Sequence, residues 1–566
     1  MKDKEKRLGV CKDIAIVGLP LAIFLFWILT AWKINYQIHD DRYMMEFLSG
    51  KFLASSDAHL VYIKYPLAIL MQGVYQLFPG HDWYATVMLS LQIAMIAVMT
   101  WYIVRNVKQM KYKVFSQIVF YSFFILCWIN EVICFTYTTV AALVGATIIV
   151  VYVLGKDRIR DYIMLLLLCF IVFNVRSDLF LMILPFCGMI WIWKLLHKNA
   201  KKQIIFLFTL LLVIGSSWAC NAVAYSSEPW NEYMKYNSAR TKVYDYAYND
   251  LIVYQNNREL YEKLNISEEE CKILESYDLS LCDEKLYDKM QDIADTYTDN
   301  KSLGTKVHNM LKVFLVDGLL ESKMMTLVSF FLWGILIVST VWLRKKDVVW
   351  LDIGLAFLQI VLWLYLGYRG RILPRVSHSM LLIQIVTPCI CLYYTFCDAS
   401  IQKWNRNVKR LVSMGMLIVL VGVSAYDVLL CKKLMHKNEK EAGDRDQYII
   451  EEYCNRHKEN FYFLDVFSVA QCKYTFDFNN KNEYENFVSL GDWYGDSPIY
   501  KKKLQIENID SVRQAVLENE NVYVIGIVGK DLGFISGVTD KEVTIEPVDF
   551  LDGGMDDYVV YQVKSL

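Results

Sequence analysis

Long apolar runs separated by short polar loops dominate the chain, and the length of these runs is the clearest signal in the sequence. A helix needs about 20 mostly apolar residues to cross the hydrocarbon core of a membrane. Runs such as Ile14–Trp32 and Leu411–Leu430 meet that length. The pattern predicts eleven membrane spans. Their approximate bounds are residues 14–32, 83–104, 114–134, 136–155, 161–175, 179–196, 203–222, 323–343, 348–366, 376–397 and 411–431.

Basic residues test this number of spans. If the N-terminus is cytoplasmic, every second loop lies in the cytoplasm too, and the positive-inside rule requires those loops to be rich in Lys and Arg. The basic clusters in these loops are Arg105–Lys113, Lys156–Arg160, Lys194–Lys202, Arg344–Lys346 and Lys403–Arg410. One span more or fewer would invert every later loop, so the charges support eleven spans with a cytoplasmic N-terminus.

The opposite side of the membrane then receives most of the polar chain, namely loops 33–82 and 223–322 and the tail after Cys431. Within the first loop, the stretch Val61–Phe78 mixes polar residues with apolar ones. We expect an amphipathic helix that lies in the membrane interface there. A twelfth span at this place would contradict the charge rule.

The tail has a different pattern, with short apolar runs between polar turns. Phe461–Phe467, Val522–Val528 and Tyr558–Val563 are strand-like, and Ile509–Glu518 has helical spacing. We expect a transmembrane domain over residues 1–431 and a small extracytoplasmic α/β domain over residues 432–566 that folds alone. The predicted fold class is therefore an α-helical polytopic membrane protein with an appended α/β domain.

Composition adds two points. The 566 residues are 55% hydrophobic with a formal net charge of −1, and this charge balance argues against a nucleic-acid partner. Most of the 14 cysteines lie in or beside spans, where Cys is an ordinary small apolar residue. Cys271, Cys282, Cys454 and Cys472 lie outside spans; two disulfides or four free thiols are both compatible with their positions.

The first candidate site is the run His39-Asp40-Asp41-Arg42, a few residues beyond the first span. A carboxylate at the membrane surface can act as a general base or hold a divalent metal such as Mg²⁺ or Mn²⁺. Neighbouring aspartates do not point the same way, so we expect one of them to face a site. The alternative is a solvated start of a loop.

The second candidate is a short turn with three arginines, Arg369, Arg371 and Arg375, on the side where the charge rule disfavours them. A guanidinium binds phosphate oxygens with two hydrogen bonds, so this turn is suited to a phosphate. Arg176, between two spans, adds a fourth cation on the same side. The alternative is that these arginines extend to lipid headgroups.

Aromatic and polar residues alternate at the start of the loop 223–322, at Trp230, Glu232, Tyr236 and Arg240. Such a mixture suits the faces and hydroxyls of a sugar, and it also suits a membrane interface. Glu131 is a further possible acid. His59, His81 and His378 show no metal-ligand spacing. The sequence has no P-loop, no dinucleotide fingerprint and no nucleophile elbow, which argues against an ATP-driven pump.

Together these features resemble the GT-C superfamily of integral membrane glycosyltransferases. In that fold the loop after the first span carries a catalytic acid and continues through juxtamembrane helices, as His39-Asp40-Asp41 and Val61–Phe78 do here. The chain also resembles large bacterial membrane proteins with a Tyr-Asn-x-x-Arg-x-x-x-x-Asp-Tyr element, here Tyr236–Tyr246, and a Gly-Arg-x-x-Pro-Arg turn, here Gly370–Arg375. The resemblance extends to about residue 431.

The resemblance implies a multi-pass protein of a bacterial cell membrane. It also implies transfer of a sugar from a polyprenyl-phosphate carrier to an extracytoplasmic glycan acceptor, with membrane lipid as a further partner. An aspartate would act as general base, and arginines would stabilise the lipid-phosphate leaving group. Between the two aspartates we favour Asp41, because it is farther from the end of the span. Two other functions stay open: an O-antigen-type polysaccharide polymerase, and a non-enzymatic transporter or flippase of lipid or polysaccharide.

Overall fold

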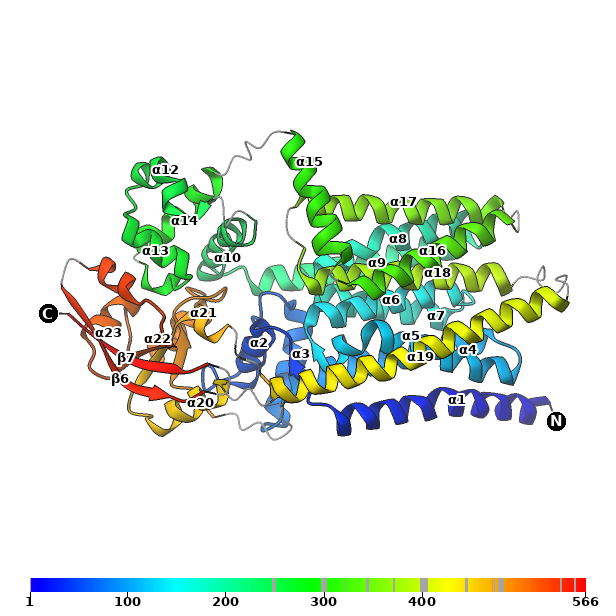
Figure 1. Cartoon of the computed structure of the whole chain (residues 1–566), viewed down its shortest axis with the longest axis horizontal. Coiled ribbons are helices and arrows are strands. Elements are labelled where there is room, and N and C mark those ends of the chain that lie inside the picture. The colour runs from blue at the N-terminus through cyan, green and yellow to red at the C-terminus, as the bar shows by residue number, and fades with distance from the viewer. Residues whose placement is uncertain are drawn as a thin grey trace.

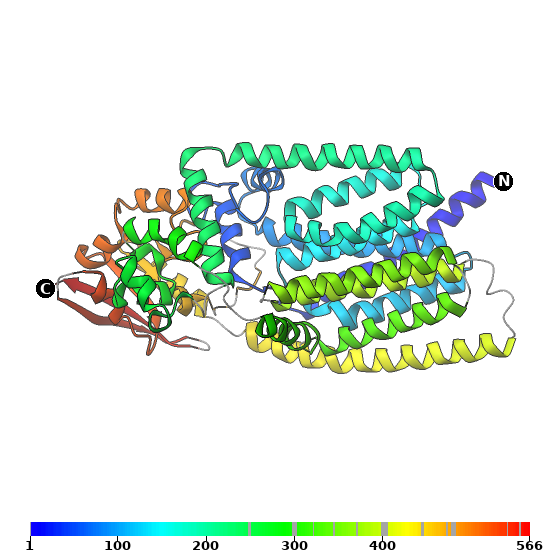
Figure 2. The same ribbon diagram turned by 90° about the horizontal axis from the view of Figure 1, so that it is seen from above.

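Two parts of the molecule lie end to end in Figure 1: a bundle of long helices, and a part of shorter helices with a β-sheet. The computed structural model describes residues 2–246, 251–282, 284–296, 303–320, 322–342, 346–369, 372–397, 406–442, 446–470, 472, 474–476, 483–539, 542–553 and 556–565. The N-terminus lies at the far end of the bundle, and the C-terminus lies at the opposite end of the molecule (Figures 1 and 2).

The bundle is built from the long apolar runs of the sequence. Its helices are α1 (Lys2–Ala31), α4 (Trp83–Asn106), α5 (Met110–Ile133), α6 (Tyr137–Leu154), α7 (Ile159–Val175), α8 (Ser177–His197), α9 (Ala200–Ala224), α16 (Lys323–Trp342), α17 (Lys346–Tyr368), α18 (Pro374–Cys397) and α19 (Arg406–Ala442). Among the described helices, nine are long and apolar enough to cross a membrane by length and composition. The structure confirms an α-helical multi-pass membrane protein; the number eleven stays a prediction, because α7 and α19 are not among the nine.

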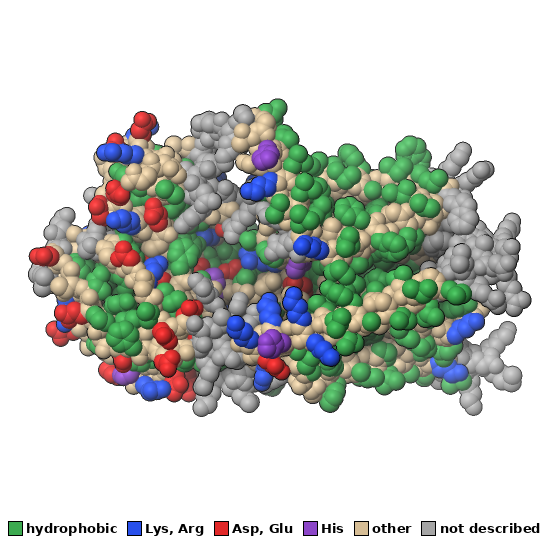
Figure 3. All heavy atoms as spheres, viewed as in Figure 1, with side chains coloured by type: hydrophobic (Ala, Val, Ile, Leu, Met, Phe, Trp, Pro, Cys, Tyr) green, Lys and Arg blue, Asp and Glu red, His purple; other side chains and the backbone are tan. Residues whose placement is uncertain are grey.

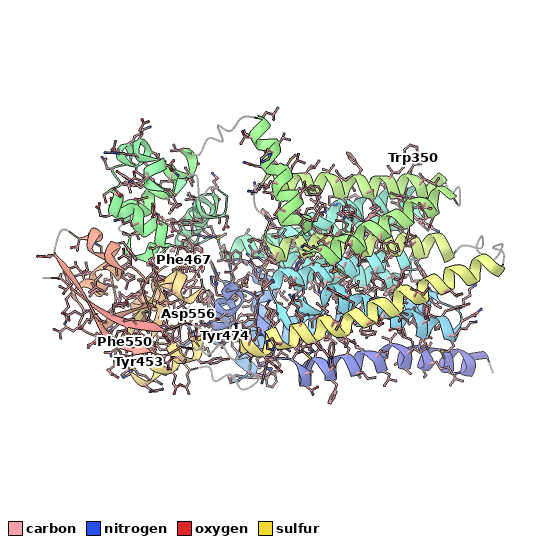
Figure 4. All side chains as sticks on the ribbon, viewed as in Figure 1. Trp350, Tyr453, Phe467, Tyr474, Phe550 and Asp556 are labelled. Atoms are coloured by element: carbon pink, nitrogen blue, oxygen red, sulfur yellow. The ribbon has the colours of Figure 1, made fainter. Side chains whose placement is uncertain are left out.

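Helix α6 forms the centre of the bundle. It carries no charged residue, nearly all of its side chains are buried, and it packs against α4, α7, α8 and α18. Apolar side chains cover the outside of the bundle instead of charges, as Figure 3 shows, and Leu212, Trp218 and Val338 are among the most exposed. Trp350 is exposed near the end of the bundle far from the sheet (Figure 4). Such aromatic residues are enriched at membrane–water interfaces.

Two short helices lie where the bundle meets the rest of the molecule: α2 (His39–Ser49) and α3 (Tyr65–Leu77) (Figure 1). Helix α3 begins with Pro66 in its first turn, where proline is favoured. Its outer face exposes Leu70 and Leu77. The expected helix is present; its position in the membrane interface stays a prediction.

The loop 223–322 forms a small helical unit with its own core around Tyr261, Ile293 and Cys271. Its helices are α10 (Glu228–Thr241), α12 (Arg258–Lys263), α13 (Glu268–Ser276) and α14 (Glu284–Thr296), whereas α15 (Leu303–Lys312), from the end of the same loop, packs on α17 of the bundle (Figure 1). A reciprocal cap starts α13: the Ser267 side chain accepts a hydrogen bond from the backbone of Glu270, and the Glu270 carboxylate accepts one from the backbone of Ser267.

The C-terminal part contains a five-stranded mixed sheet in the order β4-β3-β5-β7-β6. The strands are β3 (Phe461–Leu464), β4 (Phe487–Ser489), β5 (Val522–Ile527), β6 (Val543–Leu551) and β7 (Tyr558–Ser565), with helices α20 (Asp446–Arg456), α21 (Val466–Val469), α22 (Pro498–Ile506) and α23 (Val512–Glu518). Strands β3, β4 and β5 are parallel, and β5, β7 and β6 are antiparallel. The three expected strands and the expected helix are present in this small α/β unit, whereas β4 and β6 were not expected.

The C-terminal part packs closely on the bundle end. Strand β1 (Asn35–Tyr36) pairs with β2 (Cys134–Phe135), and the segment 474–476 lies along the other side of β1. The Tyr36 N–H donates to the Tyr474 carbonyl at 3.0 Å, and the Tyr474 ring stacks on the Tyr36 ring at 5.5 Å. Figure 4 shows Tyr474 at this junction. The division of the chain at residue 431, with a tail that folds alone, stays a prediction, and residue 431 lies inside α19.

Buried charges also connect α2 to the C-terminal part. Arg42 contacts Glu46 at 2.5 Å and Glu451 of α20 at 3.2 Å, and all three side chains are largely excluded from solvent. Lys51 lies 3.8 Å from Glu485, just before β4. The four cysteines outside the spans are free thiols, so the structure has neither of the two disulfides that the sequence left open.

A pair of buried carboxyl groups joins the loop 223–322 to the sheet. Asp278 accepts from the backbone N–H of Val466 at 3.0 Å, and the neighbouring Asp465 pairs with Lys530 at 2.9 Å. Burial, and then the charge of Asp465, raise the pKa of Asp278 well above its ordinary value. Asp278 therefore keeps its proton in the folded state at pH values where an unfolded chain releases it.

We expect Asp278→Asn to stabilise the fold at alkaline pH and to have little effect near pH 4. The folded wild type binds a proton that the unfolded chain loses above about pH 3.9, so its stability falls as pH rises through this range. In the Asp278→Asn variant the side-chain amide neither binds nor releases a proton in this pH range, so this loss of stability does not occur. Melting temperatures at pH 4, 7 and 9 measure the effect. The control is Asp295→Asn on the exposed face of α14; parallel pH curves for wild type and Asp278→Asn would contradict the expectation.

Candidate functional site

The two aspartates after the first span lie in the first turn of α2 and point in different directions. Consecutive residues of a helix are about 100° apart around its axis. Asp41 points into the core, where it is fully buried and accepts from the Tyr84 hydroxyl at 2.5 Å and from the Tyr137 N–H at 2.9 Å. It therefore holds α2 against the start of α6. Burial raises the pKa of Asp41 to about 7.

Asp40 lies on the other side of the turn, and its side chain is 15% exposed. This reverses the preference that the sequence suggested: Asp41 is not free to reach a substrate, and Asp40 is. Burial raises the pKa of Asp40, and the charges of His39, Arg375 and Arg176 act in the opposite direction. A carboxylate with a raised pKa is a stronger base at neutral pH than an ordinary aspartate.

Two of the four expected arginines lie around Asp40. Arg375 is in the first turn of α18, and Arg176 lies between α7 and α8. Arg176 donates to the Tyr137 hydroxyl and lies 3.4 Å from Asp178. Within the described part of the chain, Arg375 makes no ion pair with a carboxylate, so its guanidinium is available to an anion. Arg369 is exposed at the end of α17, and Arg371 lies outside the described residues.

The loop after β4 brings a third carboxylate to this place. His39 contacts Asp492 at 2.9 Å. Burial acts most strongly and lowers the pKa of His39, but the charge and hydrogen bond of Asp492 and the charge of Asp40 together outweigh it and raise that pKa to about 9. Burial acts most strongly and raises the pKa of Asp492, but the charge and hydrogen bond of His39, the Trp493 N–H and the charge of Arg240 together outweigh it, and the pKa falls. We refer to His39, Asp40, Asp492, Arg176 and Arg375 as the polar cluster.

The Asp492 loop depends on a close backbone approach. A Cβ on Gly491 would lie 2.3 Å from the carbonyl oxygen of Tyr277, so only glycine fits there. The backbone of Leu490 accepts a hydrogen bond from Ser280 at 2.7 Å. Asp492 itself has a φ of +69°, in the left-handed region that aspartate tolerates better than most residues.

Aromatic side chains border the polar cluster. Tyr62 stacks against Tyr137 at 5.8 Å and lies 4.8 Å from the Trp493 ring. Arg240 donates to the Tyr277 hydroxyl and to Asn237. The charge of Arg240 also acts on Asp492, which places it beside the cluster. Rings next to guanidinium and carboxylate groups suit the apolar face and the hydroxyls of a sugar.

The other three residues expected to contact a sugar lie elsewhere. Trp230 is buried, and its ring stacks on His59 at 4.8 Å, so it supports the contact between α10 and the first loop. Glu232 is exposed on α10, and Tyr236 is partly buried between the core of the loop and the main core. Of the four residues, only Arg240 lies beside the polar cluster.

Glu131 and His378 form a pair that the sequence did not suggest. Glu131 is buried at the end of α5, and its carboxylate lies 2.8 Å from His378 Nδ1. His378 is three residues after Arg375 on α18, so the two side chains share a face of that helix. The pair therefore lies one helical turn from the polar cluster.

A divalent metal was expected as a possible cofactor, and His39, Asp40 and Asp492 have donor atoms within 4.8 Å of one another. Only two of the three are carboxylates, and the nitrogen of His39 already binds Asp492. Mg²⁺ prefers oxygen ligands, so this set suits Mn²⁺ better than Mg²⁺. A metal stays a prediction, and no step below uses one.

Sequence reasoning missed Asp492, Tyr62 and Tyr277. Asp492 stands in the run Gly491-Asp492-Trp493-Tyr494-Gly495, in which two glycines frame an acid and two aromatic residues. A loop of this composition is a functional candidate by itself. Charged side chains lie in a recess between the two parts of the molecule in Figure 3. None of three comparisons with known proteins gives a match: no family model fits the chain, and no curated protein and no solved structure is significantly similar to it.

Proposed function

We propose that this protein is a membrane glycosyltransferase that moves a sugar from a polyprenyl-phosphate carrier to an extracytoplasmic glycan acceptor. One observation carries the proposal: the partly exposed carboxylate of Asp40 lies near two arginines, Arg375 and Arg176, at the end of the helical bundle. A base next to a phosphate-binding group at the membrane surface is what transfer from a lipid phosphate requires.

In the proposed reaction, the acceptor oxygen attacks the anomeric carbon while its proton passes to Asp40. A new C–O bond forms, and the bond between the anomeric carbon and the phosphate oxygen breaks. The electron pair of that bond leaves with the lipid phosphate, whose charge Arg375 and Arg176 stabilise. His39 and Asp492 hold the loop beside Asp40 in place. The half-buried ring of Tyr62 can contact the sugar, and the buried Trp493 holds that ring in place.

The test is transfer by the purified full chain in liposomes that contain polyprenyl-phosphate sugars. Acceptor glycans are added outside, and the products are identified by mass spectrometry. A sugar added to the acceptor, with release of polyprenyl phosphate, supports the proposal. Chain extension of a lipid-linked oligosaccharide points to a polymerase, and movement of the lipid across the bilayer without a new glycosidic bond points to a flippase.

We expect Arg375→Lys to lower transfer by about 10- to 100-fold, because lysine keeps the charge but loses the two-pronged contact with phosphate. The measurement is kcat and KM for the lipid donor, with Arg258→Lys on the distant and exposed helix α12 as the control. Wild-type kinetics in Arg375→Lys would mean that this side chain only contacts lipid headgroups.

We expect the C-terminal part to lie outside the cell and the N-terminus inside. The basic loops alternate as the positive-inside rule requires, and the two termini lie at opposite ends of the molecule (Figure 1). Reporter fusions after Lys113 and after Glu441 should report opposite sides of the membrane. The same side for both fusions would contradict the predicted orientation of the polar cluster.

A further inference from the structure

A second place in the bundle has the features of a binding site. A groove of about 410 Å³ lies on its flank between α1, α4 and α7. Its walls are apolar, with Val17 on α1, Ala97 and Val98 on α4, and Met164 on α7. Helix α1 packs on α4 and α5 at the edge of the bundle (Figure 1), and few of the residues in its apolar stretch are buried.

Two arginines, Arg105 and Arg160, line one end of this groove. Arg105 is in the last turn of α4 and lies over the Trp101 ring at 5.3 Å, and in the described part of the chain it has no ion pair with a carboxylate. Arg160 is half exposed and lies 3.8 Å from Asp161. That distance is too long for a hydrogen bond.

The carboxylate of Asp161, the residue after Arg160, already accepts hydrogen bonds from other groups. Asp161 accepts from the Tyr102 hydroxyl at 2.8 Å and from the backbone N–H groups of Lys156 and Arg158. Arg105 is repelled by the like charges of Arg160 and Arg158, and the charge of Asp161 acts in the opposite direction. An anion between Arg105 and Arg160 would relieve this repulsion, since guanidinium groups bind phosphate oxygens in pairs.

We infer that this groove binds a phospholipid with an anionic headgroup. Its phosphate contacts Arg105 and Arg160, and an acyl chain lies between α1 and α4 along Val17 and Val98. The charge of the arginines and the apolar walls together select this class of ligand. The bound lipid fills the space beside α1 and holds that helix to the bundle.

The groove is separate from the polar cluster. Helix α7 begins beside Arg160 and ends next to Arg176, and a helix of its 17 residues is about 25 Å long. The lipid in the groove is therefore not the sugar donor proposed above. This inference holds whether or not the protein transfers sugars.

The test is lipid binding by the delipidated full chain in detergent, measured by native mass spectrometry. Phosphatidylglycerol and phosphatidylcholine with identical acyl chains are titrated separately. We expect the Kd of phosphatidylglycerol to be about 10-fold lower in the wild type. The double variant Arg105→Gln and Arg160→Gln should lose this preference. Lys108→Gln removes one charge from the exposed loop nearby and should keep it.

A third variant tests the apolar walls without changing the charge. Ala97→Trp fills the groove and should weaken binding of both lipids. If the double variant does not fold, this variant still tests whether lipids bind in the groove. Equal Kd values for the two lipids in the wild type, or a preference that survives the double variant, would overturn the inference. So would tighter binding of a polyprenyl phosphate than of phosphatidylglycerol at the same arginines, because the groove would then belong to the carrier.

Discussion

Asp40→Asn should lower sugar transfer by roughly a hundred- to ten-thousand-fold, because an amide cannot accept the proton of the acceptor hydroxyl. The fold should change little, since the Asp40 side chain is partly exposed and, among the described residues, accepts no hydrogen bond from the core. Asp41→Asn is the matched control. Its amide oxygen can still accept from Tyr84 and Tyr137, so transfer should stay within several-fold of wild type.

The two variants are compared by kcat in liposomes, with a melting curve for each. The wild-type rate should also fall as pH drops through the pKa of Asp40, which burial places above that of an ordinary aspartate, because only the ionised form is a base. A reversed result, with Asp41→Asn inactive and Asp40→Asn active, would contradict the assignment made from exposure. Wild-type rates for both variants would make Glu131, which contacts His378, the next candidate for the general base.

Arg42→Ala should destabilise the junction between α2 and the C-terminal part by about 3–5 kcal/mol, the cost of leaving a buried charge without its partner. Glu46 is 2% exposed, and Arg42 is its contact at 2.5 Å. The nearby Glu485 is buried as well, and burial raises its pKa to about 8. Without Arg42, the carboxylates of Glu46 and Glu485 remain buried near each other, away from water.

Unfolding by denaturant in detergent, followed by the fluorescence of tryptophans near the junction, measures this effect. Arg456→Ala is the control, because its pair with Glu452 is exposed and contributes at most about 1 kcal/mol. Arg42→Met with Glu46→Leu removes both charges and should recover much of the loss. Equal unfolding of Arg42→Ala and Arg456→Ala would mean that water or another cation compensates the carboxylates.

The sequence was sufficient where one physical signal is strong and local. Apolar run length predicted the long helices of the bundle, and strand-like runs predicted β3, β5 and β7. Strand β6 was missed because most of its side chains are exposed at the edge of the sheet, so it has no apolar run. Strand β4 has only three residues, too few for a recognisable period.

The candidate site was predictable only in part. Asp40, Arg176 and Arg375 were found because each is a charge just beyond a membrane span. Asp492 was not found, since more than 400 residues separate it from Asp40 in the sequence. The expectation that Asp41 is the freer of the two side chains was wrong for a local reason: the sequence suggested a loop, whereas α2 begins at His39 and turns neighbouring side chains apart.

The strand contact at the bundle end has a consequence for how the protein is made. Asn35 pairs with Thr475, which a ribosome adds 440 residues later. The first loop therefore leaves the translocation machinery long before the tail segment that contacts it has been synthesised. During that time Asp40 has no Asp492 near it. Under the function proposed here, a half-made chain has Asp40 without Asp492 beside it, so we expect no action on lipid donors until nearly all of the spans and most of the tail have been synthesised.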